Sequence, residues 1–560
     1  MTAVLFQRIR SACMRAARAG VSPLQRAGES ALSSRASAVP GRVAGRSAVC
    51  RSVALAVLLL ALLAACARAP QPSAGRPLVI AMASDVTTFD PHMTAAVGGN
   101  LSVLGHLYPA LVERGPDLQL RPALASSWDA VSPTHWRFHL VDGARFGNGE
   151  ALDAQAVRWN LERVRDPAVH ARIGPWFAAI ERVEAPDPRT LEIHTRSPFP
   201  ALPAQLSMLF LLPPQWAASH DPARETAPGG RYTVVENLPG DRLRLRRNPD
   251  WYGAPAPFDE VEFRVVPSPT ARVAALLAGE VDFITGLPIA ELARIRASGR
   301  ADAGSVPSIR SVFIKFNTLQ PPLDDVRVRR ALNLAVDRQA IAEALFEGQA
   351  PVSRCQLLTP EYLGFDPALA PPPFDPDRAR ALLREAGISP GTRLRLEVPV
   401  NYTLQGEEVA QAVAAQLQDV GLDVDLVQLD QAYYMDRYIK GRQLAPLSLL
   451  THAWPTIDAD GLLSLLHSDS PYAYYRDPVL DRLLAQGRDT LDADARGRIY
   501  RQAEAHLCEQ APVLFLYAQP ATYATSPRVR WQPRGDDWIR AWDLHPVDAA
   551  TPLPAPDVTR

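Results

Sequence analysis

The sequence predicts an α/β protein with mixed sheets and at least two lobes. Strand-like and helix-like segments alternate along the whole chain, as in α/β architectures. The 495 residues from Cys66 to Arg560 exceed the roughly 250–300 residues that one hydrophobic core can organise. We find no internal repeat and no low-complexity core. A single-core fold is therefore not expected.

Strands are indicated by short apolar runs and by alternation of apolar and polar residues. In chain order we expect them at Leu78–Ala81, Trp136–Leu140, Thr190–Thr195, Tyr232–Glu236, Arg242–Arg246, Asp423–Leu429 and Leu447–Leu450. The last of these is apolar except for Ser448, which is typical of a strand buried on both faces.

Helices are indicated by their end signals. Asp153 precedes a helix over 154–164, and Asp477-Pro478 begins another. Asp375-Pro376 starts a helix that Gly387 ends, with the cap, the N1 proline and the C′ glycine in their preferred places. A stripe from Val409 to Val420 predicts one more helix, closed by Gly421.

A 13-residue apolar run, Val53 to Ala65, follows Arg51 and ends at Leu63-Ala64-Ala65-Cys66. It is shorter than the roughly 20 residues that a membrane-spanning helix needs, and a basic flank with small residues at the boundary is typical of a secretory signal. The boundary resembles the lipobox of bacterial lipoproteins, which implies acylation of Cys66. Alternatives are a plain signal peptide or an internal anchor. We expect residues 1–65 to be leader and signal peptide, with translation starting downstream of Met1 or an unusually long leader, and 66–76 to be a flexible tether.

The near-neutral charge of the whole chain hides an acidic body. Residues 1–51 carry nine Arg and one Glu, a net +8, whereas the whole chain carries −1. Because residues 52–65 are uncharged, the part from Cys66 onward carries about −9. Nucleic-acid binding, which needs clustered positive charge, is therefore not expected.

Cysteine use is sparse after Cys66, since only Cys355 and Cys508 follow. Two distant thiols form neither a disulfide framework nor a CxxC site. They can pair in an oxidising compartment. We favour two separate, buried thiols.

Motifs of catalysis are absent from the sequence. It contains no GxxxxGK[ST], no HExxH and no GxSxG, and its eleven His build no i,i+3 or i,i+4 metal face on an expected helix. Of the carboxylate pairs, Asp324-Asp325 and Glu407-Glu408 fit helix starts, where they offset the dipole. Asp536-Asp537 lies in a polar stretch and is expected to be solvated.

The pair Asp458 and Asp460 has a stronger functional interpretation. It follows Trp454 and the apolar strand at 447–450, and ligands gather at the carboxyl ends of strands in open α/β sheets. A Trp ring with nearby carboxylates suits an ammonium group. The alternative is an acidic loop that caps the helix at 461–466.

The stretch Phe316–Ala350 (FNTLQPPLDDVRVRRALNLAVDRQAIAEALFEGQA) resembles the peptide/nickel class of extracytoplasmic solute-binding proteins of ABC importers, solute-binding protein family 5. Further blocks agree in order: Asp90-Pro91, Leu111–Glu113, Pro122–Trp128, Phe138–Leu140, Phe146–Glu150, Arg247–Tyr252 and Leu277–Asp282. The resemblance implies a two-lobed periplasmic-binding-protein (class II, cluster C) fold with hinge strands and an extra subdomain in the large lobe. Lobe I is expected at 77–118, 232–308 and 521–560, its subdomain at 119–231, and lobe II at 309–520.

The resemblance also implies a function. A lipid-anchored periplasmic monomer, without cofactor or metal, would capture short peptides or related amine-bearing solutes by hinge closure and deliver them to a membrane permease. Other solutes remain open: a metal chelate of the nickel type, a glutathione-like peptide or an opine. A remote alternative is an extracytoplasmic hydrolase that uses Asp458 and Asp460.

Ligand residues carry over from the family with departures. Peptide binders place an Asp three residues after the Trp, but position +3 after Trp454 is Ile457 and Asp458 stands at +4. Either Asp458 is the amine-binding residue displaced by one, or Asp458-Ala459-Asp460 matches a later Asp-Pro-Asp and the amine-binding Asp is missing. Where dipeptide binders have an Arg, this chain has Asn401-Tyr402. The expected ligand-binding residues are Asp458, Trp454, Asp460, Tyr402, Asn401 and Met93.

Overall fold

A ten-stranded mixed sheet organises most of the chain in the computed structural model, which describes residues 75–547. Its order is β14-β13-β15-β12-β16-β11-β1-β10-β9-β8. The strands are β1 (Leu78–Met82), β8 (Tyr232–Leu238), β9 (Arg242–Arg247), β10 (Glu260–Val265), β11 (Phe283–Thr285), β12 (Asp302–Phe316), β13 (Arg393–Pro399), β14 (Asp423–Leu429), β15 (Leu447–His452) and β16 (Val513–Thr525). β1 pairs in parallel with β10 and β11, and β13 with β14 and β15, whereas β16 runs antiparallel to β11 and β12.

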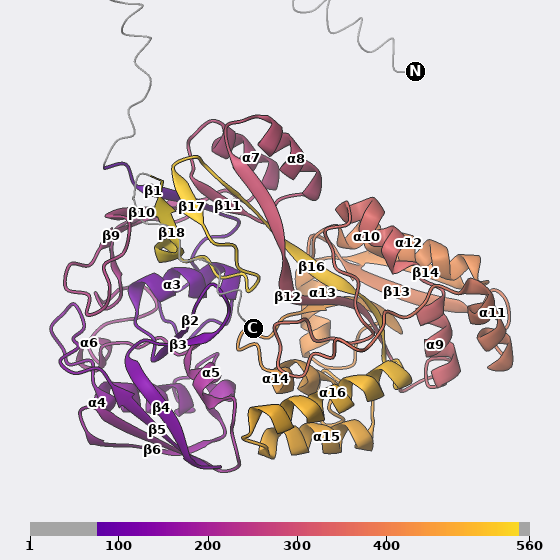
Figure 1. Cartoon of the computed structure of the whole chain (residues 1–560), viewed down its shortest axis with the longest axis horizontal. Coiled ribbons are helices and arrows are strands. Elements are labelled where there is room, and N and C mark those ends of the chain that lie inside the picture. The colour runs from indigo at the N-terminus through magenta and orange to yellow at the C-terminus, as the bar shows by residue number, and fades with distance from the viewer. Residues whose placement is uncertain (1–74, 548–560) are drawn as a thin grey trace, which may run out of the picture. The chain divides into compact units, whose positions relative to one another are not determined.

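The two longest strands, β12 and β16, belong to both halves of the sheet (Figure 1). At one end they pair next to β11, and at the other end β12 pairs with β15. Their register shifts between Pro307 and Ser311, where the ladder is interrupted. Such an irregularity bends a strand, and it lies beside the boundary near 308 that the sequence predicts between the lobes. The lobe boundaries themselves remain predictions.

The two faces of the large sheet bury different cores, because successive side chains of a strand point to opposite faces. In β1, Val79 and Ala81 join one core while Leu78, Ile80 and Met82 join another. The first core is covered by α7 (Pro269–Leu277), α8 (Ile289–Ala297), α9 (Val326–Leu334), α10 (Arg338–Phe346), α11 (Pro376–Glu385) and α12 (Gly406–Asp419). The opposite face carries two cores, one around η1 (Val97–Leu101), α3 (Ser102–Leu107) and β8–β10, the other around α13 (Gln431–Ile439), α14 (Ala459–Leu463), η3 (Ser464–Leu466), α15 (Pro478–Asp489) and α16 (Ala493–Gln510).

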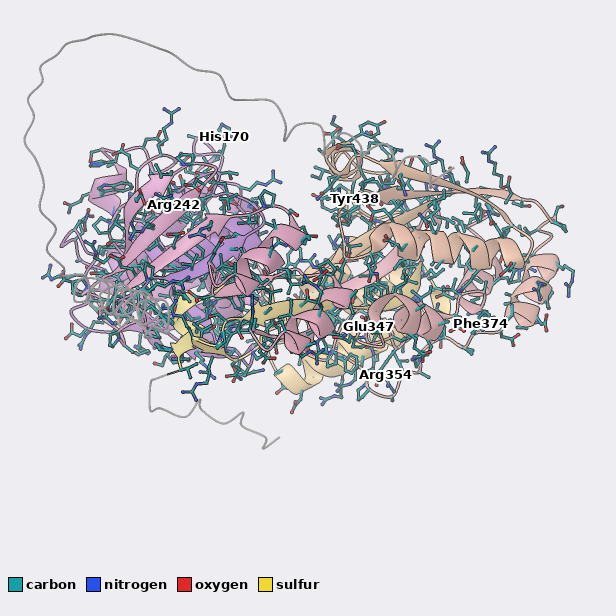
Figure 2. All side chains as sticks on the ribbon, turned by 90° about the horizontal axis from the view of Figure 1, so that it is seen from above. His170, Arg242, Glu347, Arg354, Phe374 and Tyr438 are labelled. Carbon is teal, nitrogen blue, oxygen red and sulfur yellow. A yellow bond between two sulfur atoms is a disulfide. The ribbon has the colours of Figure 1, made fainter. Side chains whose placement is uncertain are left out.

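A second, four-stranded sheet lies within the region expected to form the subdomain. Its order is β4 (Ala125–Ser132), β5 (His135–Leu140), β7 (Thr190–Thr195), β6 (Ile180–Asp187). It has its own core with α4 (Ala154–Arg165), η2 (Gly174–Phe177) and α5 (Leu202–Leu206). The remaining elements are α6 (Pro214–Ala217), η4 (Ala541–Asp543) and two small hairpins, β2 (Val112–Arg114) with β3 (Leu120–Pro122) and β17 (Val529–Trp531) with β18 (Leu544–Pro546). In Figure 2, His170 and Arg242 lie at the left of the view, and Phe374 lies at the right.

The predicted strands and helices are confirmed, with ends that differ by a few residues. β7 and β14 have the predicted bounds, and α4, α11 and α15 begin after caps at Asp153, Asp375 and Asp477. The α/β class with mixed sheets is therefore confirmed.

The expectation of two separate thiols is wrong. Cys355 and Cys508 form a disulfide with Cα atoms 5.2 Å apart, although 153 residues separate them in the sequence. The bond ties the segment before Gln356 to α16. One turn earlier on α16, the buried Glu504 carboxylate accepts hydrogen bonds from the backbone amides of Leu357 and Leu358.

Lys315 of β12 is buried in an aromatic cage. Its ammonium lies 4.6 Å from the ring centre of Tyr474 and 5.0 Å from that of Tyr438, and donates to the carbonyl of Tyr472. Burial, together with the charge of Arg442, lowers the pKa of Lys315 to about 7.

The apolar run, Cys66 and the tether to residue 74 lie outside the described residues. Among the helices within 75–547, none combines the length and apolarity that crossing a membrane requires.

Candidate functional site

Asp458 has two structural partners in the loop after β15. Its Oδ1 accepts a hydrogen bond from the amide of Asp460 at 3.0 Å, so it caps α14. Both of its oxygens also accept from Arg496 of α16, at 2.6 and 2.8 Å. The residue is only 8% exposed. A buried bidentate pair of this kind satisfies the carboxylate within the protein.

Asp460 is similarly occupied. Its Oδ1 accepts from Arg488 Nε at 2.8 Å and from Ser464 Oγ at 3.0 Å. Burial raises the pKa of Asp460, with Arg488 opposing the shift and the charge of Asp458 adding to it. The geometry fits the capping alternative and the alignment in which the amine-binding Asp is missing. Recognition of an ammonium group by either residue stays a prediction.

Trp454 packs against its own loop. A Cβ atom on Gly461 would lie 2.0 Å from Trp454 Nε1, so only glycine allows the ring to lie this close to α14. The backbone amide of Trp454 donates to Tyr362 Oη at 2.7 Å. Part of the predicted aromatic platform is therefore covered by the helix that follows it.

The other predicted residues lie on separate segments. Tyr402 donates from Oη to the Thr451 carbonyl at 3.1 Å, at the end of β15. Asn401, in a left-handed conformation (φ 56°), donates its amide to Glu407 at 2.8 Å. Met93 lies between β1 and η1 with 39% of its surface exposed. Burial raises the pKa of Tyr402, and the charge of Arg310 opposes this shift.

A cavity of about 280 Å³ lies where both halves of the large sheet meet. Its wall combines the end of β11, the C-terminal half of β16, the strand irregularity in β12, and the segment after β17. The lining residues are Gly98, Thr285, Gly286, Arg310, Leu404, Gln519–Tyr523, Trp531, Arg534 and Asp537–Ile539. Arg310 falls in the predicted lobe II and Asp537 in the predicted lobe I. A molecule in this cavity would therefore touch both predicted lobes.

An ion pair between Arg310 and Asp537 forms part of this wall. The guanidinium lies 2.6 Å from the carboxylate, and the side chains are 28% and 32% exposed. Burial alone would lower the pKa of Arg310, but Asp537 raises it above its usual range. One positive and one negative group, both reachable from the cavity, can therefore contact a ligand.

Arg534, which also lines the cavity, is largely buried between Asp536 at 2.7 Å and Asp543 at 2.6 Å. Asp536 is 3% exposed, so the expectation that the pair Asp536-Asp537 is solvated is wrong for Asp536. Burial would raise the pKa of Asp536, and Arg534 lowers it instead. The charged residues of this segment pair with one another inside the protein, so its polar sequence does not indicate exposure to solvent.

Two further arginines connect this wall to the loop that carries Trp454. Arg540 lies over the rings of Trp538 and Trp542, at 5.1 and 5.6 Å, and donates to the Arg114 carbonyl. The Arg114 side chain donates to the carbonyls of Leu118, at 2.6 Å, and Thr456. Burial lowers the pKa of each guanidinium to about 10. In both cases the hydrogen bonds described end on backbone carbonyls.

Arg310 and Trp538 were not predicted as site residues from the sequence, and Asp537 was expected only to be solvated. A usable signal was present in the segment 531–542, which contains three Trp, two Arg and two Asp within twelve residues. Arg310 carried a weaker signal, as a charged residue within a strand that is otherwise largely apolar.

A family model described as bacterial extracellular solute-binding proteins, family 5 (middle region) matches residues 119–473. The chain belongs to this family. The matched range covers more than half of the sequence and confirms the resemblance carried by Phe316–Ala350.

The alignments with curated relatives of this solute-binding protein cover most of both chains. The chain is similar to the probable deoxycholate-binding periplasmic protein YgiS of Escherichia coli K12, with 27% identity over 499 residues (82% of this chain, 92% of the relative). It is similar to the glutathione-binding protein GsiB of Shigella boydii, with 27% identity over 490 residues (83% and 92%). These relatives are solute-binding proteins, not enzymes.

Solved structures share the two-lobed fold. The binding protein DppA from Helicobacter pylori, in complex with the peptide STSA, has a TM-score of 0.73 at 21% identity and covers 84% of this chain and 98% of its own. NikZ from Campylobacter jejuni, in complex with Ni(L-His), has a TM-score of 0.73 at 19% identity and covers 84% and 99%. One fold thus accommodates a peptide and a metal chelate, so the ligand must be argued from the site.

Proposed function

We propose that this chain is the substrate-binding component of an ABC importer, and that it captures short peptides or related amine-bearing solutes in the cavity lined by Arg310 and Asp537. The ion pair between these residues is the observation that supports this assignment most strongly. Asp537 offers a carboxylate to an ammonium group, and Arg310 offers donors to a carboxylate. A zwitterionic solute would replace the ion pair by two ligand contacts.

The remainder of the cavity suits a small solute with an apolar part. Trp531, Trp538 and Tyr523 provide aromatic surface, which is the usual complement to a few orienting polar groups. The volume of about 280 Å³ is just below the roughly 300–1,000 Å³ typical of ligand pockets, which favours a solute of at most a few residues.

Hinge closure would couple binding to delivery. A ligand held by Arg310 on β12 and by Asp537 on the C-terminal segment favours the state in which these elements are close. The hydrogen bond from Arg114 to the Thr456 carbonyl would further stabilise that state. The closed protein would then dock as a monomer on a permease in the membrane, and no bond in the solute would be made or broken.

The test is a calorimetric comparison of free and N-acetylated tripeptides. We expect the wild type to prefer the free amine, and Asp537→Asn to lose that preference with roughly 10- to 100-fold weaker binding of the free peptide. Arg378→Gln, which removes an exposed ion pair with Glu385, is the matched control. If Asp537→Asn keeps the preference while Asp458→Asn loses it, the amine is bound at Asp458 and the assignment to Asp537 is wrong.

A second candidate is an acidic solute such as a glutathione-like peptide. Arg114 and Arg540 favour it, because they add positive charge near the site and the hydrogen bonds described for them end on backbone carbonyls. GsiB, by name a glutathione-binding protein, is a relative. Tighter binding of glutathione than of trialanine, lost in Arg114→Gln, would support this candidate. Native mass spectrometry of protein purified without added ligand would also detect a peptide, an opine or a metal chelate.

We also propose that Cys66 anchors the protein to a bacterial membrane on the periplasmic side. Cys66→Ser would then abolish the mass added by the lipid and release the protein from the membrane fraction. An unchanged fractionation would contradict the anchor and leave the solute site unaffected.

A further inference from the structure

The outer face of the four-stranded sheet brings together two His and one Glu. Alternation along β7 points Leu191 and Ile193 into the core and leaves Glu192 and His194 on the other face. On the neighbouring strand β5, His135 is the register partner of His194. One ligand atom from each of His135, Glu192 and His194 lies within 4.8 Å of the others.

The distances between these groups approach those of a metal site. His135 Nε2 lies 3.4 Å from Glu192 Oε2. Two ligands that each lie about 2.0–2.1 Å from a tetrahedral Zn²⁺ are about 3.4 Å apart, so this edge already has the required length. The His135 and His194 rings are stacked, with centres 4.0 Å apart and planes 18° apart. Small side-chain rotations would turn both Nε2 atoms toward one point.

The surroundings prepare Glu192 to act as a ligand through one oxygen. Its Oε1 accepts from Arg137 at 2.9–3.0 Å, which fixes the carboxylate and leaves Oε2 facing His135. An outer partner that orients a ligand in this way is usual in metal sites. His135 Nε2 is buried and makes no hydrogen bond within the described part of the chain. A buried, unsatisfied ring nitrogen beside a carboxylate oxygen is the arrangement that a cation would complete.

Two residues of β6 adjoin the cluster. Arg182 donates to His194 Nε2 at 3.0 Å and therefore occupies the atom that a metal would use. The Arg182 side chain is 56% exposed, so it can turn into solvent at little cost. Glu184 lies 3.6 Å from His194 Nε2 and offers a fourth ligand.

We propose that His135, Glu192 and His194 form a binding site for a divalent transition-metal ion, of which Zn²⁺ is the representative probe. Imidazole with one carboxylate suits Zn²⁺, Ni²⁺ and Cu²⁺ and is a poor set for Mg²⁺ or Ca²⁺. None of these residues lines the solute cavity, so the site is independent of the proposed function. A metal here would clip β5 to β7 on a sheet whose reverse side is packed against its own core.

The test is isothermal titration of untagged, chelator-treated full-length protein with Zn²⁺, and a Co²⁺ titration that reads the coordination geometry from the visible spectrum. We expect one saturable site, a rise in melting temperature with Zn²⁺ but not with Mg²⁺, and at least a tenfold loss of affinity in His194→Gln and in Glu192→Gln. His139→Gln is the matched control, since His139 lies on the same face of β5 and is 48% exposed. A wild type without saturable Zn²⁺ binding would overturn the proposal, as would equal affinities of His194→Gln and His139→Gln.

Because each variant could perturb the sheet, its far-ultraviolet circular dichroism and its melting temperature without metal are measured beside the wild type. A variant that melts like the wild type and loses only the Zn²⁺-dependent rise assigns the residue to the site. Loss of solute binding together with Zn²⁺ binding would contradict the independence of the two sites.

Discussion

The guanidinium of Arg310 lies 2.6 Å from the carboxylate of Asp537, across 227 residues of sequence. The pair joins the irregular part of β12 to the segment after β17, and both members face the cavity. Each side chain is nearly one-third exposed, so desolvation and mutual attraction are both moderate.

We expect the double variant Arg310→Gln/Asp537→Asn to keep a free energy of unfolding within about 1 kcal/mol of the wild type, because partly exposed pairs add little net stability. Urea denaturation followed by intrinsic fluorescence measures this. The same variant should lose solute binding, which separates a binding role from a stabilising one. A loss of several kcal/mol would show that the pair mainly holds the fold.

Asp458, unlike the Arg310–Asp537 pair, should contribute strongly to the free energy of unfolding. Asp458→Asn keeps a good helix cap but leaves Arg496 buried without its counter-charge, a change that costs about 3–5 kcal/mol. Asp460→Asn is the matched control: its partner Arg488 is 41% exposed, and we expect a loss below about 1 kcal/mol. Equal effects in the two variants, measured by urea denaturation, would contradict this assignment of roles.

Glu504 should make stability depend on pH. Burial raises the pKa of Glu504 to about 7, partly offset by the amides of Leu358 and Leu357, whereas the unfolded carboxyl has its ordinary value of 4.5. The folded state therefore binds more protons between these values. Its contribution to stability is full below pH 4.5 and is lost as the pH rises through 7, by roughly 3 kcal/mol. Glu504→Gln, which keeps an acceptor for both amides, should flatten this part of the pH profile of urea unfolding. An unchanged slope would mean that Glu504 is ionised in the fold.

The Cys355–Cys508 bond should stabilise the protein by constraining the unfolded chain. Because it closes a loop of about 150 residues, reduction should cost about 2–5 kcal/mol. Melting of the wild type with and without dithiothreitol measures the effect, and Cys355→Ala/Cys508→Ala should be insensitive to the reagent. If reduction leaves the wild type unchanged, the bond adds no net stability.

Local signals predicted what depends on local contacts. Asp153, Asp375 and Asp477 cap helices through amides two or three residues away, so their roles follow from neighbouring sequence. The position of Arg310 depends on the register in which β12 pairs with β16. The sequence of neither strand indicates that register. Asp536 was expected to be solvated because its sequence neighbours are polar, but its partner Arg534 is buried beside it.

The site was predicted less well than the fold for the same reason. A carboxylate after a buried strand is visible in the sequence at Asp458, but its partner Arg496 is 38 residues away on α16. The pairing of Cys355 with Cys508 and the cavity wall at Asp537 likewise depend on how distant segments meet. Family resemblance supplied the architecture, and it could not supply these contacts.

Because Lys315 is buried, the folded chain offers very few amines to amine-reactive reagents. Lys440, which is 60% exposed, is the other lysine in the sequence. An amine-reactive dye would thus attach to one lysine side chain, at the end of α13, apart from the chain's α-amino group. Attachment at Lys315 would report that its aromatic cage had opened, which gives a chemical readout of unfolding without any substitution.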